Sequence, residues 1–188
     1  MKGTENLKMQ DKRLIPDSTF FSFFLHNTNE PDSLKRIIAE FYVEIPPRIS
    51  EEIKNCKYCQ SIDDVKHKLH IFQGNLNFTE LLKPFFSKEE KERGEHDVIV
   101  VGYFCHELKI DFLMIIDDGG ARKFISRNFP YLTSKLDWTA NFIADCHSKF
   151  GIFKKEEVLD LLDKMGKSTF RIDKKSLLKI VEGIKWLI

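Results

Sequence analysis

The sequence predicts an α/β fold built around a mostly parallel sheet. Short apolar, β-branched segments alternate with longer segments whose apolar residues recur at helical spacing. The segment 109–116 is almost continuously apolar, as expected of a strand that is covered on both faces. The 188 residues, 42% of them hydrophobic, suit a single domain with one sizeable core. We therefore expect one domain over residues 1–188.

The elements of the first half follow from strand composition, helix caps and prolines. Asp17 follows the first strand and is a plausible N-cap of the next helix. Asp32 or Ser33 supplies the cap of the helix after it. Pro46-Pro47 stops the second strand and opens another helix. The expected order is strand 13–16, helix 18–25, helix 33–40, strand 41–45 and helix 47–55.

The second half repeats the alternation after a less regular stretch. Residues 1–12 form a charged N-terminal segment, and residues 56–92 form a helical insert with two short helices separated at Gly74-Asn75. Beyond the insert the pattern is clear again. The expected order is helix 94–107, strand 109–116, helix 121–128, strand 135–138 and helices 139–149, 155–164 and 174–187.

Composition excludes several classes of protein. The formal net charge is +1, so nucleic acid would have to be attracted by local basic patches. The longest apolar runs are too short to cross a bilayer, and the charged first residues do not resemble a signal peptide. The four cysteines are expected to be reduced thiols, and the expected location is the cytoplasm.

Acidic residues fall where ligands collect in an open parallel sheet, beyond the carboxyl ends of strands. Asp17 follows the first strand, and Asp117-Asp118 follow the strongest one. Glu52, preceded by Glu51, lies one turn into the helix after the second strand. Asp97, with Glu95 as an alternative, lies in the first turn of the helix 94–107. These side chains are expected to share one crevice.

Four carboxylates in one crevice would repel one another unless a cation neutralised them. An oxygen-only ligand set suits Mg²⁺ or Mn²⁺ rather than zinc. Such a site matches phosphodiester hydrolysis, in which the metal lowers the pKa of a bound water and stabilises charge on the phosphoryl oxygens. The acids therefore favour a metal-dependent nuclease.

Four ordered segments resemble the motifs of PIN domains. They are Ile-Pro-Asp-Ser-Thr-Phe at 15–20, Ile-Pro-Pro-Arg-Ile-Ser-Glu-Glu-Ile at 45–53, Gly-Glu-His-Asp-Val at 94–98 and Ile-Ile-Asp-Asp-Gly-Gly-Ala-Arg at 115–122. The tail, with Gly-Ile-Phe at 151–153 and Phe-Arg-Ile-Asp at 170–173, is similar to a prokaryotic PIN subgroup. The resemblance covers residues 13–187 and implies a three-layer α/β/α fold.

The resemblance also implies a function and a set of site residues. PIN domains are usually Mg²⁺- or Mn²⁺-dependent ribonucleases. Catalytic residues carried over by position are Asp17, Glu52, Asp97 and Asp118, of which Asp17, Asp97 and Asp118 would be metal ligands. Substrate contacts would come from Ser18, Arg122 and Thr139. The implied partners are single-stranded RNA, a second copy in a homodimer and, for a toxin, an antitoxin protein.

Simpler readings stand beside these. Asp17 would serve only as an N-cap, Asp117-Asp118 only as a turn, and Asp97 only as a charge favoured by the helix dipole. The pair Cys56 and Cys59 with His67 and His70 lacks the spacing of a zinc finger, so zinc is not expected. A catalytically silent PIN-like binding module is the main alternative function. A phosphoacceptor receiver domain is a third, but its required lysine after the last strand is not evident.

Overall fold

The centre of the fold is a five-stranded sheet in the order β3-β2-β1-β4-β5, and every pair of neighbours is parallel. In the computed structural model, residues 12–54, 59–73, 77–86 and 93–186 are described. The strands are β1 (Arg13–Pro16), β2 (Tyr42–Ile45), β3 (Leu69–Ile71), β4 (Phe112–Ile115) and β5 (Leu136–Asp137). The predicted α/β class with a parallel sheet is confirmed.

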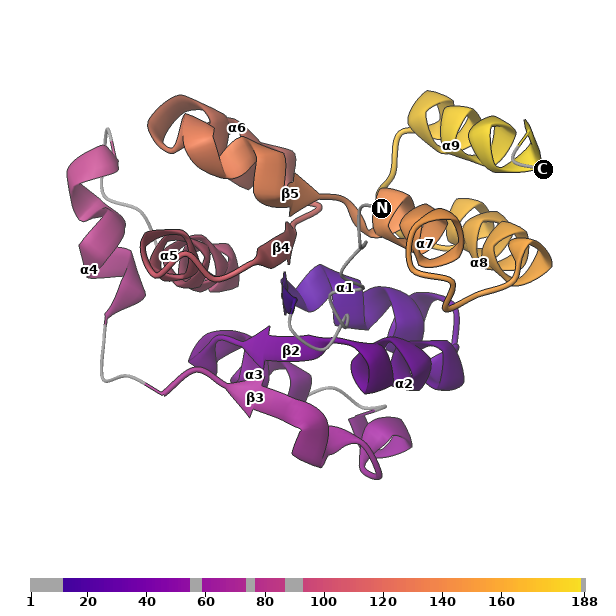
Figure 1. Cartoon of the computed structure of the whole chain (residues 1–188), viewed down its shortest axis with the longest axis horizontal. Coiled ribbons are helices and arrows are strands. Elements are labelled where there is room, and N and C mark those ends of the chain that lie inside the picture. The colour runs from indigo at the N-terminus through magenta and orange to yellow at the C-terminus, as the bar shows by residue number, and fades with distance from the viewer. Residues whose placement is uncertain (1–11, 55–58, 74–76, 87–92, 187–188) are drawn as a thin grey trace, which may run out of the picture.

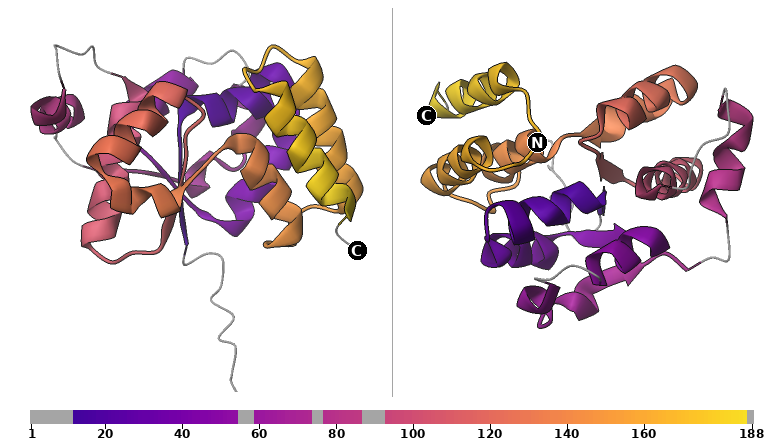
Figure 2. Two further views of the ribbon diagram at one scale, coloured as in Figure 1. Left: turned by 90° about the horizontal axis from the view of Figure 1, so that it is seen from above. Right: turned by 180° about the vertical axis from the view of Figure 1, so that it is seen from behind.

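Helices cover both faces of this sheet and give the expected three layers (Figures 1 and 2). On one face α5 packs against β4 and β1, with α6 and α4 beside it; on the other lie α1, α2 and α7, with α8 and α9 outside α7. The helices are α1 (Ser18–Ser22), α2 (Pro31–Glu40), α3 (Pro47–Lys54), α4 (Phe78–Leu82), α5 (Gly94–Glu107), α6 (Gly119–Asn128), α7 (Thr139–Ser148), α8 (Lys155–Lys167) and α9 (Lys174–Trp186).

Burial on both faces explains the apolar sequence of the central strands. Leu14 and Ile15 of β1, and Met114 and Ile115 of β4, are fully buried. Phenylalanine rings fill the layer between the sheet and α7 in edge-to-face pairs, such as the pair of Phe20 and Phe142 at 5.8 Å between ring centroids. Such pairs add to the stabilisation that buried area provides. Much of the abundant phenylalanine therefore serves the core.

The structure confirms one predicted helix start and corrects another. The Asp17 side chain accepts a hydrogen bond from the Phe20 amide at 3.0 Å, so the predicted cap of α1 is confirmed. The predicted start of α2 at Ser33, capped by Asp32 or Ser33, is wrong. The helix begins at Pro31, after Glu30, which makes no capping bond through its side chain. Proline at the first helical position presets the backbone angle, and this preference decides the boundary.

The insert 56–92 contains a strand that the sequence did not predict. Leu69–Ile71 forms β3 and pairs with β2, where two short helices were expected. Three residues are too few to distinguish a strand from a helix by periodicity, and the unpaired edge of β2 decides the outcome. The described remainder is helical: short 3-10 turns at Cys59–Ile62, Lys66–Lys68 and Lys83–Phe85, and α4. Residues 55–58, 74–76 and 87–92, as well as 1–11, lie outside the described residues.

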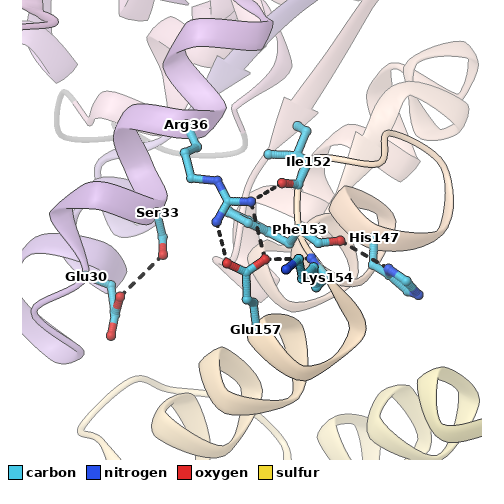
Figure 3. Close-up of polar contacts among 8 residues, drawn as sticks. All are labelled: Glu30, Ser33, Arg36, His147, Ile152, Phe153, Lys154 and Glu157. Atoms are coloured by element: carbon cyan, nitrogen blue, oxygen red, sulfur yellow. Dashed lines mark hydrogen bonds and ion pairs between the residues drawn. The ribbon is translucent and has the colours of Figure 1, made fainter.

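A polar cluster around Arg36 joins α2 to the start of α8 (Figure 3). The Arg36 guanidinium donates to both carboxylate oxygens of Glu157, at 2.6 and 3.3 Å, and also to the Ile152 carbonyl. Glu157 in turn accepts the backbone N–H of Lys154 at 2.6 Å. The Arg36 guanidinium lies 4.6 Å from the Phe153 ring centroid. The Arg36 side chain therefore holds the loop between α7 and α8 against α2.

Two of the four cysteines lie among residues whose side chains are described. Cys105 and Cys146 are both buried free thiols, which agrees with the reduced state expected for them. Cys56 lies outside the described residues. Of the helices in the described ranges, none is both long enough and apolar enough to span a bilayer.

Candidate functional site

The carboxyl ends of β1 and β4 bring two aspartates together. The two strands are neighbours in the sheet, with Pro16 opposite Ile115 in register. Asp17 is the next residue after β1, and its backbone N–H donates to the Ile115 carbonyl at 2.9 Å. Asp117 follows at the end of the neighbouring strand. The adjacency of these two strands, predicted only in general terms by the sequence, creates the site.

Asp17 is almost fully buried, with 1% of its surface exposed. Its Oδ1 accepts the Phe20 N–H at 3.0 Å, and its Oδ2 accepts the Asp117 N–H at 3.1 Å. Burial raises the pKa of Asp17 to about 7, and the negative charges of Asp117 and Glu95 raise it as well. Each carboxylate oxygen has two lone pairs, so both oxygens keep one for a further partner.

Asp117 is held by the first residue of α7. Its carboxylate accepts the Thr139 backbone N–H at 3.0 Å and the Thr139 hydroxyl. Burial raises the pKa of Asp117, although these two bonds and the nearby charge of Arg122 act in the opposite direction. The result is a second, partly buried carboxylate with a fixed orientation beside Asp17.

Thr139 was expected to contact substrate, and this expectation is corrected by its position. The residue is 0% exposed, and its hydroxyl donates to Asp117. Because it has no exposed surface, it cannot touch an RNA directly. Its role in the site is to position Asp117.

The Arg122 side chain hydrogen-bonds to the backbone just after β4 and at the end of β5, beside Asp117. Its Nη1 donates to the carbonyls of Ile116 at 3.0 Å and Asp137 at 2.9 Å. The guanidinium also lies 4.9 Å from the centroid of the Trp138 ring. Burial lowers the pKa of Arg122, whereas Asp137 and Asp117 raise it. The expected phosphate contact stays a prediction, since the observed contacts of Arg122 are with protein groups.

Two surface pockets flank the buried aspartates. The first, about 330 Å³, is lined by Ser18, Ser22, His26 and Glu52 among others. Glu52 also lies against the start of α5. A Cβ added at Gly94 would lie 3.1 Å from the Glu52 Oε1 and 2.5 Å from Cδ1 of Ile49, so glycine permits this close approach of α3 to α5. Of Glu51 and Glu52, the pocket contains Glu52.

The second pocket, about 220 Å³, contains Glu95 and Asp118. Arg93, His96 and Phe124 are among its other lining residues. Asp118 is exposed and caps α6, with its Oδ1 accepting the Ala121 N–H at 2.7 Å. The helix α6 therefore begins at Gly119, two residues before the predicted start at Ala121, and Asp118 is its cap as well as an acid at the strand end. Glu95 is the acid of α5 whose charge acts on Asp17.

Asp97 was preferred over Glu95 in the prediction, and its place in the site stays a prediction. Like Asp17 it is buried, with 3% of its surface exposed, and neither of these two side chains is among those that line the two pockets. Asp97 shares its helix face with Val101 and Cys105, which are also buried. Of Glu95 and Asp97, Glu95 lines a pocket.

The acids offer oxygen ligands of the kind that a divalent cation binds, but their present arrangement does not form a complete site. Within the described ranges, no group of three or more His, Cys, Asp or Glu side chains is arranged to hold a metal ion. Asp17 and Asp117 form a fixed pair, and Glu95, Asp118 and Glu52 line the adjacent pockets. Oxygen ligands of this kind suit Mg²⁺ or Mn²⁺. For a third ligand, the side chain of Glu52, Glu95 or Asp118 would have to rotate towards Asp17 and Asp117.

Comparison with known proteins gave no relative: no family model, no curated protein and no solved structure matches this chain.

Proposed function

We propose that this protein is a Mg²⁺- or Mn²⁺-dependent ribonuclease. The observation that carries the proposal is the pair of carboxylates, the buried Asp17 and the partly buried Asp117, at the carboxyl ends of adjacent parallel strands. Burial raises the pKa of both groups, and repulsion by the negative charge of Asp117 raises the pKa of Asp17 further. A cation between them would remove that repulsion. This arrangement is more readily understood as a binding site than as a structural contact.

Each acid has a distinct part in the proposal. Asp17 and Asp117 would hold the cation, because their orientation is fixed by backbone and Thr139 hydrogen bonds. Glu95 and Asp118 would complete the oxygen ligands or orient the attacking water from one side, and Glu52 from the other. A bound divalent cation lowers the pKa of a coordinated water and stabilises charge on phosphoryl oxygens.

RNA as the substrate is supported by the ordered resemblance of four segments to PIN-domain motifs, and by Arg93 beside the pocket that holds Glu95 and Asp118. Ser18 is half-buried and lines the other pocket, and it would donate to a phosphate oxygen. Homodimerisation, an antitoxin partner and a cytoplasmic location rest on the sequence alone and belong to the same proposal.

The test is cleavage of a fluorescent single-stranded RNA in the presence of Mn²⁺, with and without EDTA. We expect metal-dependent cleavage by the unchanged protein and a loss of at least about 100-fold in Asp17→Asn, because a metal ligand and its charge are removed. Asp173→Asn is the matched control. Asp173 also accepts a backbone N–H three residues on, at 2.9 Å from Ser176, but it lies at the start of α9, away from the sheet edge.

The outcomes separate the two function hypotheses. Full activity in Asp17→Asn would contradict the assigned site. Binding of RNA by the unchanged protein without cleavage in Mg²⁺ or Mn²⁺ would favour the catalytically silent binding module.

A further inference from the structure

A second surface feature lies on the α5–α6 side of the sheet, where α4 and α6 flank α5 (Figure 1). It is a groove of about 490 Å³, here called the aromatic groove. Its lining residues include Leu81 and Phe85, Tyr103 and Phe104 of α5, and Phe129 and Tyr131. Neither acid pocket shares these residues.

The rings of the aromatic groove are arranged around a buried base. Phe129 is 5% exposed, whereas Phe85, Tyr103 and Tyr131 are 45%, 36% and 43% exposed. Ring centroids of these three lie 4.8, 6.4 and 6.3 Å from that of Phe129. Exposed rings gathered at one place offer apolar surface to another flat group. Singly scattered apolar residues would need no explanation, but a cluster does.

The aromatic groove is continuous with the acid edge through a chain of rings. Phe86 and Phe124 line the pocket that holds Glu95 and Asp118, with their ring centroids 5.3 Å apart. The Phe124 ring lies 6.1 Å from Phe129, at the base of the aromatic groove. Helix α5 runs from one feature to the other. At about 1.5 Å per residue, Glu95 and Tyr103 are roughly 12 Å apart along the helix axis.

Helix α6 carries exposed basic side chains as well as Phe124. Lys123 and Arg127 are exposed and four residues apart, so they lie on one side of the helix beside the face that carries Phe124 and Asn128. In the ranges that the structure describes, neither forms an ion pair. Arg93 adds a third cation at the acid pocket. A row of cations beside a row of rings matches the phosphates and bases of one nucleic-acid strand.

We propose that the aromatic groove stacks the bases of a single-stranded RNA whose phosphodiester backbone continues into the Glu95–Asp118 pocket. The inference rests on the proposed ribonuclease function and assigns the substrate a path on the surface. Stacking accepts any base, because every base has a π face, so binding shows little preference for sequence. A duplex binds more weakly, since its bases are already stacked and paired.

The first test measures binding separately from cleavage. Fluorescence anisotropy of a labelled, mixed-sequence RNA 12-mer is followed in EDTA, where metal-dependent hydrolysis cannot occur. Tyr103→Ala and Tyr131→Ala are each expected to raise Kd roughly 5- to 100-fold. Trp186→Ala is the matched control, because Trp186 is an aromatic residue that is 84% exposed on α9, far along the chain from the aromatic groove. Its Kd is expected to stay within twofold of the unchanged protein. Thermal melting checks that each variant folds.

The second test uses salt dependence to find the phosphate contacts. For single strands, log K falls with log salt at a slope of about 0.7 per neutralised phosphate. The double variant Lys123→Ala, Arg127→Ala is expected to reduce the slope by about 1.4 and to leave base stacking intact. An unchanged slope would overturn the proposal that the RNA backbone runs along α6.

The results of these assays distinguish this inference from the proposed function. Metal-dependent cleavage with unchanged Kd in both tyrosine variants overturns the aromatic groove as the RNA site and leaves the ribonuclease standing. Loss of binding in the tyrosine variants without any cleavage by the unchanged protein supports the RNA path and contradicts the nuclease. A shift from dimer to monomer in the tyrosine variants, with RNA binding unchanged, assigns the aromatic groove to contacts between copies and overturns the proposal.

Discussion

Asp17 combines two roles that are usually kept apart. As an N-cap it satisfies a backbone donor of α1, a contribution of about 1 kcal/mol. As an acid, it is buried away from water and lies near the negative charge of Asp117; burial first, and that charge second, oppose ionisation and raise its pKa to about 7. A cap alone would be served equally well by serine or asparagine, which carry no charge. The charge is therefore the part that needs a functional explanation.

The raised pKa of Asp17 gives stability a defined dependence on pH. Between about pH 4 and pH 7 the folded protein binds a proton at Asp17 that the unfolded chain has released. The free energy of unfolding therefore falls as pH rises through this window, by about 1.4 kcal/mol per pH unit at most. The raised pKa of Asp117 acts in the same direction. Urea denaturation at pH 5 and pH 8 measures the effect.

The matched variants isolate the contribution of Asp17. In Asp17→Asn the unfolding free energy is expected to fall less steeply as pH rises, since asparagine does not titrate. In Asp173→Asn the fall is expected to be unchanged. An equally steep decline in Asp17→Asn would show that other groups cause it.

Thr139 offers a second test at the scale of single atoms. Thr139→Val preserves the side-chain shape but removes the hydroxyl that donates to Asp117. We expect a loss of about 1–3 kcal/mol in unfolding free energy, because a buried carboxylate loses a donor. The pKa of Asp117 should rise further, so the acidic limb of a pH–activity profile should move to higher pH. Thr139→Ser restores the hydroxyl and should restore both properties; a Val-like profile in Thr139→Ser would contradict the argument.

The position of acids at strand ends could be predicted, but their orientation could not. Asp17 and Asp117 follow apolar strands directly, so their place at the sheet edge was visible in the sequence. The sequence left Glu95 and Asp97 of α5 as alternatives, because the two side chains differ only in orientation: Asp97 is buried, whereas Glu95 lines a pocket. The link from Thr139 to Asp117 spans 22 residues and depends on β5 lying beside β4, which no local pattern encodes.

At the scale of elements, some predicted boundaries are met to the residue and others are not. The predicted bounds of strand 13–16 and helix 94–107 match β1 and α5. At α2, Pro31 and the competing caps Asp32 and Ser33 gave different starts, and the proline decided the outcome. The short strand β3 exists because β2 offers it a pairing edge. Its own sequence, Leu-His-Ile, carries too little information to predict it.

The Arg36 cluster makes a prediction about how α2 and α8 are joined. Arg36→Ala removes the two bonds to Glu157, the bond to the Ile152 carbonyl and the stacking on Phe153. We expect a loss of about 1–2 kcal/mol in unfolding free energy, measured by urea denaturation. Arg36→Lys keeps the charge but not the planar fork, so it should recover less than half of this loss.

The control for the Arg36 cluster is an ion pair within one helix. Lys149, the C-cap of α7, pairs with Asp145 of that helix at 2.7 Å, and Lys149→Ala should change stability by less than about 0.5 kcal/mol. Equal losses in Lys149→Ala and Arg36→Ala would contradict a special role for the contact between helices.

For the whole molecule, alternation of strands and helices predicted the class and the parallel sheet, but not the strand order. The order places β1 in the centre, between β2 and β4. Neighbours in space are here far apart in sequence, so periodicity within short windows holds no information about them. The three-layer arrangement was implied by the resemblance to PIN domains, and the apolar strands, which need cover on both faces, agree with it.

Cation binding should be visible as a change in the stability of the whole domain. A ligand that binds the folded state alone stabilises it by about 2.7 kcal/mol at 100 times its Kd. For a chain of this size that corresponds to a rise in Tm of roughly 5–10 °C. Differential scanning fluorimetry with Mn²⁺ should show this rise for the unchanged protein and for Asp173→Asn, but not for Asp17→Asn. A similar rise in all three proteins would place the cation elsewhere.

The central place of β1 also has a consequence for how the chain reaches its native state. Asp17 and Asp117, at the ends of β1 and β4, are 100 residues apart. Closing so long a loop before its contacts form slows folding compared with helical proteins of similar size. During synthesis β1 emerges early, and until β4 follows, its apolar residues Leu14 and Ile15 remain on an open strand edge. Such an edge promotes association between nascent chains, so production at low temperature or with chaperones should increase the soluble yield.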